Sequence, residues 1–324
     1  MPKQIIAPPL ELERKLLKRY PNLLEDISIA QELYGGRPVW RDGSIWITCD
    51  MMGKYGRIYQ PGDYSLIQLY ALWREGRTIY EYSPELAETL VSQDVPTVPC
   101  EALRRLPQWC TCITGFDASG RIAALYAYID ESELIMVWQH ANGLIYTDMV
   151  NLINGVSVID AMRETIREKK KLVANTNIEF RVNLDRERAT RGINLILYLC
   201  AENAEIQSPH KKVARTSTPQ DPDAPAAATI KPTSYNVGVR IGAAIRAALA
   251  AREVEINEVN VAAHKHASPI PHIRRAHYAT YWTGEGRKIP VVRWIEPILV
   301  GVKRVDGEVP TTIRPVLNGD ANRT

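Results

Sequence analysis

The sequence predicts an α+β fold, and three observations support that prediction. Apolar residues recur at helical spacing through roughly the first 90 residues. Short runs rich in β-branched and aromatic residues fill 109–149, and a second pair of such runs fills 272–300. Because 45% of the 324 residues are hydrophobic, the chain can bury a substantial core, and we expect a mixed α+β body over residues 1–206.

The N-terminal part is predicted to begin with two helices. Leu12, Leu16 and Tyr20 share one helical face, and Pro21 ends that run because proline cannot continue a helix. Asn22, followed three residues later by an acidic residue, is typical of the start of the second helix.

Two further helices are predicted before the β-rich region. Asp63 is placed to cap a helix that carries Tyr70 and ends at Gly76. Ser83, followed by Pro84 at the first helical position, is expected to cap the next.

An antiparallel meander is predicted over 109–149. The runs WCTCIT, RIAALYAYI, ELIMVWQH and GLIYTDM have strand composition, and the stretches DASG, DES and ANG between them favour tight turns.

The rest of the chain is predicted to hold a helical pair, a linker and a second α/β segment. Ser157 and Asp160 form a capping box at the first helix of the pair, and the second covers roughly 185–202. Residues 207–233 are rich in Pro, Ala, Ser, Thr and Lys, which is typical of a flexible linker or loop. An Ala-rich helix and a basic, aromatic β hairpin packed on the same body follow in 234–305, and a loose tail in 306–324.

Neither export nor membrane insertion is indicated. The N-terminus lacks an apolar core of the signal-peptide type, and no run approaches 18 apolar residues, so we expect a cytoplasmic protein. The five cysteines form neither an even framework nor a C-x-x-C pair, and we expect reduced thiols.

Positive charge is concentrated near the C-terminus. Residues 260–304 contain eight Lys or Arg against two Glu, a local charge of +6, although the whole chain carries only +3. A clustered basic surface attracts phosphates or acidic protein surfaces.

The histidine-rich stretch HASPIPHIRRAHYATYW at 266–282 raises the question of a catalytic or a metal site. Two histidines can cleave RNA as general base and general acid, but His272 and His277 are five residues apart and point to opposite faces of a strand. His264 and His266 could share a face, yet the window contains no Asp, Glu or Cys to complete a metal site. We therefore predict no catalytic residue, metal or cofactor here, although a site assembled from distant segments stays open.

The same region fits a binding surface better. The cations that could contact phosphates are Arg274, Arg275, Arg287, Lys288 and Arg293, and the rings that could stack on bases are Tyr278, Tyr281 and Trp282. Strand alternation mixes charged and aromatic side chains on both faces, but arginine stems packed over half-buried rings remain an alternative. The residues predicted to bind RNA, the ribosome or a protein partner are His272, Arg274, Arg275, His277, Tyr281, Trp282, Arg293 and Trp294.

The segment PHIRRAHYATYWTGEGRKIPVVRWIEPILV resembles the C-terminal signature of the type V-A anti-CRISPR family that suppresses production of the type V-A effector nuclease. That signature runs P-H-x-R-R-G-H, then Y-W, a glycine-containing turn and R-W-x-x-P. Ala276 stands where the family has Gly, and Tyr278 with Ala279 stands where members often have Trp-His. LYALWREGRTIY, LPQWC and LYLCAE also look like family segments.

The resemblance implies a binding protein that acts in the cytoplasm of a bacterial host. It would recognise the nascent N-terminal polypeptide of the CRISPR effector nuclease during translation and trigger loss of the effector mRNA, with host nucleases as the cutters. The ribosome and the mRNA are further expected partners, and a membrane is not. The alternative is an RNA-binding or metal-independent RNA-cleaving protein that uses the C-terminal His, Arg and aromatic residues.

Overall fold

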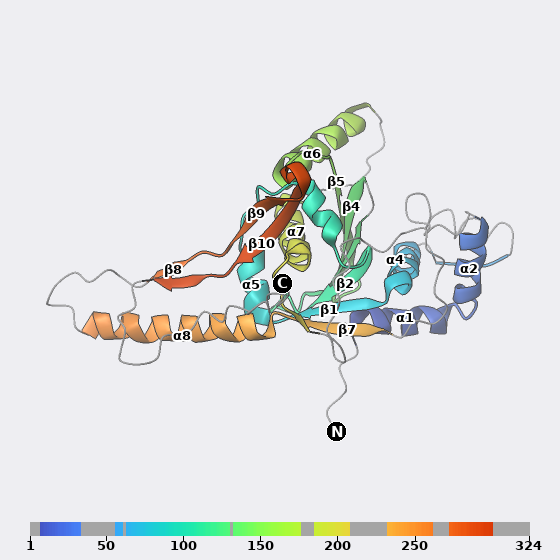
Figure 1. Ribbon diagram of the computed structural model, residues 1–324. Coiled ribbons are helices and arrows are strands. Elements are labelled where there is room, and N and C mark those ends of the chain that lie inside the picture. The colour runs from blue at the N-terminus through green and yellow to red at the C-terminus, as the bar shows by residue number, and fades with distance from the viewer. Residues whose placement is uncertain are drawn as a thin grey trace, which may run out of the picture.

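The computed structural model describes residues 7–33, 56–60, 63–129, 132–175, 185–207, 232–261 and 272–300. In that part of the chain the fold is mixed α+β, as predicted (Figure 1). A seven-stranded sheet has the order β5-β4-β3-β2-β1-β7-β6. Its strands are β1 (Thr78–Tyr82), β2 (Cys110–Thr114), β3 (Ile122–Ile129), β4 (Glu133–His140), β5 (Ile145–Asn151), β6 (Ile206–Gln207) and β7 (Thr233–Val237).

Helices cover the sheet (Figure 1). Helices α1 and α4 contact β3, α4 also contacts β2, and α7 approaches β4 at Gly192. Every residue of β2 is buried, because this strand lies inside the sheet. The helices are α1 (Pro8–Arg19), α2 (Leu23–Leu33), α4 (Tyr64–Gly76), α5 (Pro84–Val91), α6 (Val158–Asn175), α7 (Arg186–Cys200) and α8 (Val239–Val261), with the short 3₁₀ helix η2 (Cys100–Arg105).

The meander is confirmed: β2, β3, β4 and β5 pair antiparallel in sequence order. The predicted helices also occur, at the bounds given above. Of the predicted linker 207–233, Gln207 belongs to β6 and Thr233 to β7, whereas 208–231 lies outside the described residues. The tail 306–324 and the pair His264 and His266 also lie outside them.

Three strands of the sheet were not predicted: β1, β6 and β7. Strands β1 and β7 pair parallel to each other, and β6 pairs antiparallel to β7. Strand β1 also pairs parallel to β2, so it lies between two partners that are distant in sequence. Strands β1 and β7 are each only five residues long, and parallel pairing requires a crossover rather than a local turn. No short-range sequence pattern predicts such pairing. Through β7, the segment that follows the predicted linker joins the same sheet as the N-terminal body.

Asp63 and Ser83 stand at the predicted N-cap positions of α4 and α5, but neither side chain makes a capping hydrogen bond. The Asp63 carboxylate makes no cap bond and instead accepts hydrogen bonds from Arg19 and Tyr20, each at 2.6 Å. The Ser83 hydroxyl donates to the carbonyl oxygen of Gly238 at 2.8 Å, which ties α5 to the start of α8.

The capping box at the start of α6 is confirmed. The hydroxyl of Ser157 donates to the carboxylate of Asp160 at 2.7 Å, and the Asp160 amide donates back to that hydroxyl at 3.2 Å.

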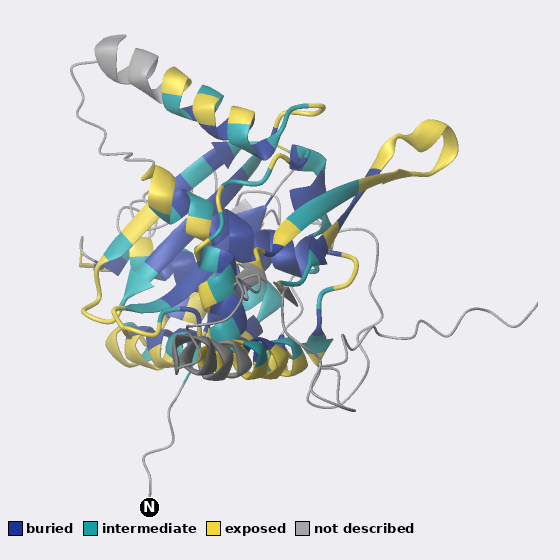
Figure 2. Cartoon of the chain, turned by 90° about the vertical axis from the view of Figure 1, so that its left-hand side faces the viewer, coloured by how far each residue is buried: buried dark blue, intermediate teal, exposed yellow. Residues whose placement is uncertain are grey.

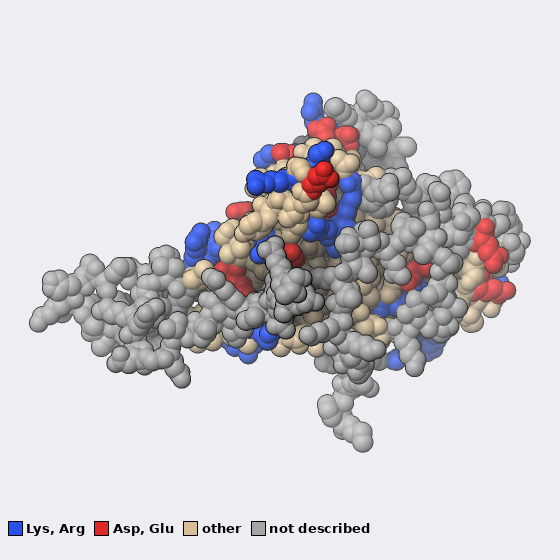
Figure 3. All heavy atoms as spheres, viewed as in Figure 1, with Lys and Arg blue, Asp and Glu red and all other residues tan. Residues whose placement is uncertain are grey.

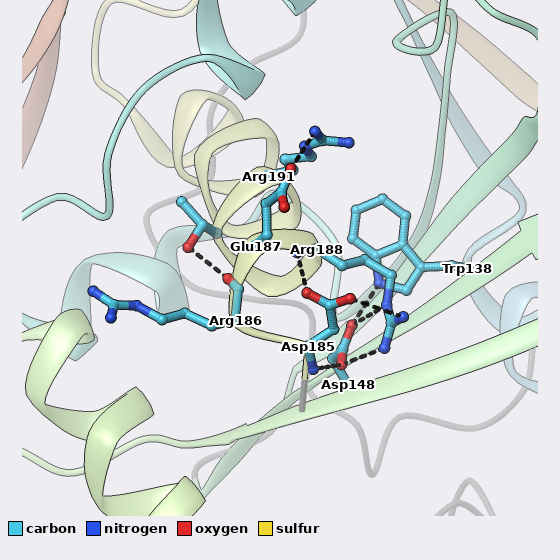
Figure 4. Close-up of polar contacts among 8 residues, drawn as sticks. Trp138, Asp148, Asp185, Arg186, Glu187, Arg188 and Arg191 are labelled. Carbon is cyan, nitrogen blue, oxygen red and sulfur yellow. Dashed lines mark hydrogen bonds and ion pairs between the residues drawn. The ribbon is translucent and has the colours of Figure 1, made fainter. Parts of the chain in front are cut away.

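A buried carboxylate joins the edge strand β5 to α7 (Figure 4). The side chain of Asp148 is fully buried and accepts two hydrogen bonds from the Arg188 guanidinium, at 2.7 and 2.8 Å. The indole of Trp138 and the backbone amide of Asp185 donate to the same carboxylate, at 3.0 and 3.2 Å. A buried charge needs such complete pairing, so this network fixes α7 against the sheet.

The cysteines within the described residues are free and buried: Cys100, Cys110, Cys112 and Cys200. Burial raises the pKa of the Cys100, Cys110 and Cys112 thiols, because a low-dielectric interior disfavours the thiolate. Cys49 lies outside the described residues.

These four thiols are therefore expected to stay unlabelled by a maleimide at neutral pH in the native protein and to react together after unfolding. Mass analysis of labelled peptides checks this result. Rapid native labelling of Cys110 or Cys112 would contradict the packing of β2.

Candidate functional site

The predicted C-terminal hairpin is confirmed, and we use this name for residues 272–300. Strand β9 (His277–Thr283) pairs antiparallel with β10 (Ile289–Ile295), and β8 (His272–Arg274) pairs antiparallel with β11 (Ile298–Val300). The two ladders are interrupted between Arg274 and His277 and between Ile295 and Ile298. Figure 2 shows the hairpin projecting from the body, with a buried base and an exposed tip.

The base of the β9–β10 ladder is part of the core. Trp294 is only 1% exposed, and its ring meets that of Tyr198 on α7 edge-on, at 5.4 Å between centroids. Tyr278, directly opposite Trp294, donates its hydroxyl to the carbonyl oxygen of Asn194 at 2.6 Å. Trp294 therefore has almost no surface with which to contact a partner.

Hydrogen bonds hold β10 against Glu202 and Asn203, just after the end of α7. The Glu202 amide donates to the carbonyl oxygen of Val292 at 2.8 Å. The amide side chain of Asn203 bonds both the amide and the carbonyl oxygen of Trp294, at 3.0 and 2.8 Å. The hairpin base is thus held by hydrogen bonds as well as by apolar contact.

Arg293 is exposed but already engaged. Its guanidinium forms an ion pair with Glu202 at 2.6 Å and lies over the Tyr281 ring, 5.6 Å from the centroid. Because this carboxylate neutralises the charge locally, Arg293 attracts an external phosphate less strongly than an unpaired arginine does.

Four other cations of the hairpin form no ion pair with any residue that the structure describes. Arg274 and Arg275 are exposed at the junction between the two ladders, and Arg287 and Lys288 are exposed at the tip. Within the described ranges, no carboxylate forms an ion pair with any of the four. Figure 3 shows basic side chains at the tip and beside the hairpin. Such unpaired cations can bind phosphates or acidic side chains.

Among the described residues, no hydrogen bond or ion pair joins the His277 side chain to a second acid-base group. His277 is exposed at the start of β9, whereas the backbone of His272 pairs with Val300 in β8 and its side chain lies outside the described residues. Across the part of the chain that the structure describes, no group of three or more His, Cys, Asp or Glu side chains could hold a metal ion. Nor does any described helix have the length and apolarity needed to cross a membrane.

The tip brings one unpredicted residue, Ile289, beside residues that the sequence predicts to bind. Tyr281 and Trp282, both predicted, are about half exposed, and Ile289 beside them is equally exposed. Thr280, Tyr281, Trp282 and Arg287 line a shallow depression. The TGEGRK turn predicts that Arg287 and Lys288 lie at the tip, and its position directly before Ile289 was the available signal for that residue.

Comparison with known proteins gave a family match and matches to solved structures. The model of the AcrVA2-like family, described as "Anti-CRISPR type V subtype A2 family", matches residues 80–302. A solved structure titled "Crystal structure of AcrVA2" is similar, with a TM-score of 0.56 and 16% sequence identity; the match covers 91% of this chain and 100% of that chain. At this identity the structural likeness shows a shared fold. No curated protein matches the sequence.

Proposed function

Because this chain belongs to the anti-CRISPR type V subtype A2 family, we propose that it recognises the nascent N-terminal polypeptide of a type V-A CRISPR effector nuclease. Recognition takes place during translation in the bacterial cytoplasm and leads to loss of the effector mRNA. On this proposal the protein is a binding protein, and host nucleases cut the message.

The family match is the observation that carries the proposal. The match extends from Tyr80 in β1 to residue 302, so it contains most of the sheet, helix α7 and the whole C-terminal hairpin. The conclusion that this is an anti-CRISPR protein of type V-A therefore applies to the folded body and the hairpin together.

The hairpin is proposed to contact ribosomal or messenger RNA. In support, Arg274, Arg275, Arg287 and Lys288 are exposed, and within the described residues none forms an ion pair. Phosphate contacts of this kind position a protein on RNA without reading sequence. Specificity would then come from the nascent polypeptide, bound elsewhere on the protein.

A second candidate function is direct RNA binding or metal-independent cleavage by the hairpin. The exposed His277 close to the cations of the ladder junction favours it, because an imidazole beside bound phosphate can transfer a proton.

Incubating the purified protein with effector transcript in the absence of ribosomes separates the two functions. We expect the transcript to remain intact, and His277→Ala to leave cellular suppression nearly unchanged. Transcript cleavage that falls about 100-fold or more in rate in His277→Ala would instead support the second function.

A further inference from the structure

The tip of the C-terminal hairpin combines a cation with exposed aromatic rings. Trp282 is 50% exposed, and within the described residues its indole makes no ring or cation contact. Tyr281, by contrast, is 48% exposed and has Arg293 over its ring. Directly across the ladder from Trp282 lies Pro290. One large planar surface is therefore available beyond the core.

The turn places Arg287 beside this surface in a defined conformation. Gly284 and Gly286 have φ of 76° and 68°, and Arg287 has φ of 51°, which a non-glycine residue adopts only when its surroundings hold it. The Arg287 amide donates to the carbonyl oxygen of Gly284 at 3.0 Å, and the Thr283 hydroxyl donates to that of Ile289 at 3.2 Å. The tip is thus preorganised.

The charge of the tip favours an anionic ligand. Arg287 and Lys288 are exposed and, among the described residues, unpaired, whereas Glu285 is the one acidic residue of the turn. An acidic peptide and RNA both carry negative charge. The half-exposed indole favours RNA, because an unpaired base offers a planar π-face for stacking and an acidic side chain does not.

We infer that the depression lined by Thr280, Tyr281, Trp282 and Arg287 is a stacking site for one unpaired base of single-stranded RNA. Trp282 provides the stacking surface, and Arg287 contacts the phosphate of the same nucleotide. This inference rests on the proposed role of the hairpin as an RNA contact, and it names the chemical group that the tip binds.

Fluorescence anisotropy with the full chain and a labelled single-stranded RNA of about 12 nucleotides tests the inference. Trp282→Ala is expected to weaken binding roughly 5- to 100-fold, the range found when one stacking aromatic is removed, whereas Trp282→Phe should stay within about 3-fold of the original protein. Leu144→Ala is the matched control, since Leu144 is 52% exposed at the β4–β5 turn. It should bind as the original does.

Arg287→Gly removes the cation and keeps the positive φ that the turn requires. Its plot of log Kd against log salt should be shallower by about 0.7, the loss of one phosphate contact to a single strand. Annealing the RNA to its complement should remove the difference between Trp282→Ala and the original protein, because paired bases cannot stack on the indole.

Three results would overturn the inference. They are equal affinity of Trp282→Ala and Leu144→Ala, no binding of single-stranded RNA at about 50 mM salt, and tight Trp282-dependent binding of an acidic peptide instead of RNA. Failure of the stacking site does not refute the proposed function, because suppression of the effector in cells is measured separately. Conversely, RNA binding by a protein that suppresses no effector would leave the stacking site standing and refute the proposed function.

Discussion

Replacing Arg274 and Arg275 together with Ala is expected to abolish suppression of the effector. Both side chains are exposed and, within the described residues, make no ion pair, so their removal costs contacts with RNA phosphates rather than contacts within the fold. Substitutions of exposed residues usually change the free energy of unfolding by no more than about 0.5 kcal/mol, so Tm should hardly move. Effector protein in cells and Tm of the purified variant should be measured together.

The matched control is Arg163→Ala with Arg167→Ala, which removes two exposed arginines from α6 instead of the hairpin. This control should suppress normally. Full suppression by a stably folded Arg274→Ala, Arg275→Ala variant would show that these cations do not contact RNA, and a variant that unfolds would show that they hold the fold. Arg293 is left out of the variant because Glu202 already pairs with it.

The second large effect is on stability. Trp294→Ala is expected to lower the free energy of unfolding by about 3–5 kcal/mol, the usual cost of truncating a buried aromatic side chain to Ala. The ring is 1% exposed and packs on Tyr198, so its removal leaves a cavity between the hairpin and α7. Chemical denaturation measures the change.

Trp282→Ala is the control, because this residue lies on the same hairpin but is half exposed. It should cost about 1 kcal/mol or less, since little packing is lost. Equal losses for the two variants would contradict the division of the hairpin into a buried base and an exposed tip.

The parts of the fold that the sequence predicted are those specified by local patterns. Turn residues between short β-rich runs predict the meander, and the spacing of Ser157 and Asp160 predicts the capping box of α6. Strands β1 and β7 were missed because their pairing joins residues near 80 to residues near 235, and only the tertiary fold makes that contact. Asp63 and Ser83 begin α4 and α5 as predicted, but distant partners take the hydrogen bonds of their side chains, and local sequence does not reveal such partners.

The sequence predicts that the candidate binding residues lie on hairpin strands, but it does not predict how deeply each of them is buried. Trp282 and Trp294 lie on the same face of the ladder, since Trp294 is opposite Tyr278 and Trp282 is four residues further along β9. They differ only in distance from the body: α7 covers Trp294, whereas Trp282 lies beyond it. Strand alternation assigns a residue to a face and says nothing about where the covering helix ends.

On the proposed function, a nascent polypeptide, rather than an RNA sequence, selects the target. The most direct measurement uses two reporter mRNAs, each of which begins with an altered form of the effector's N-terminal codons. The half-life of each reporter is measured with and without this protein. One form is recoded with synonymous codons, which changes the RNA and keeps the peptide; the other carries a compensated frameshift, which changes the peptide and nearly keeps the RNA. We predict that the protein shortens the half-life of the synonymous reporter and leaves the frameshifted reporter stable. Loss of the frameshifted message with survival of the synonymous one would contradict the account.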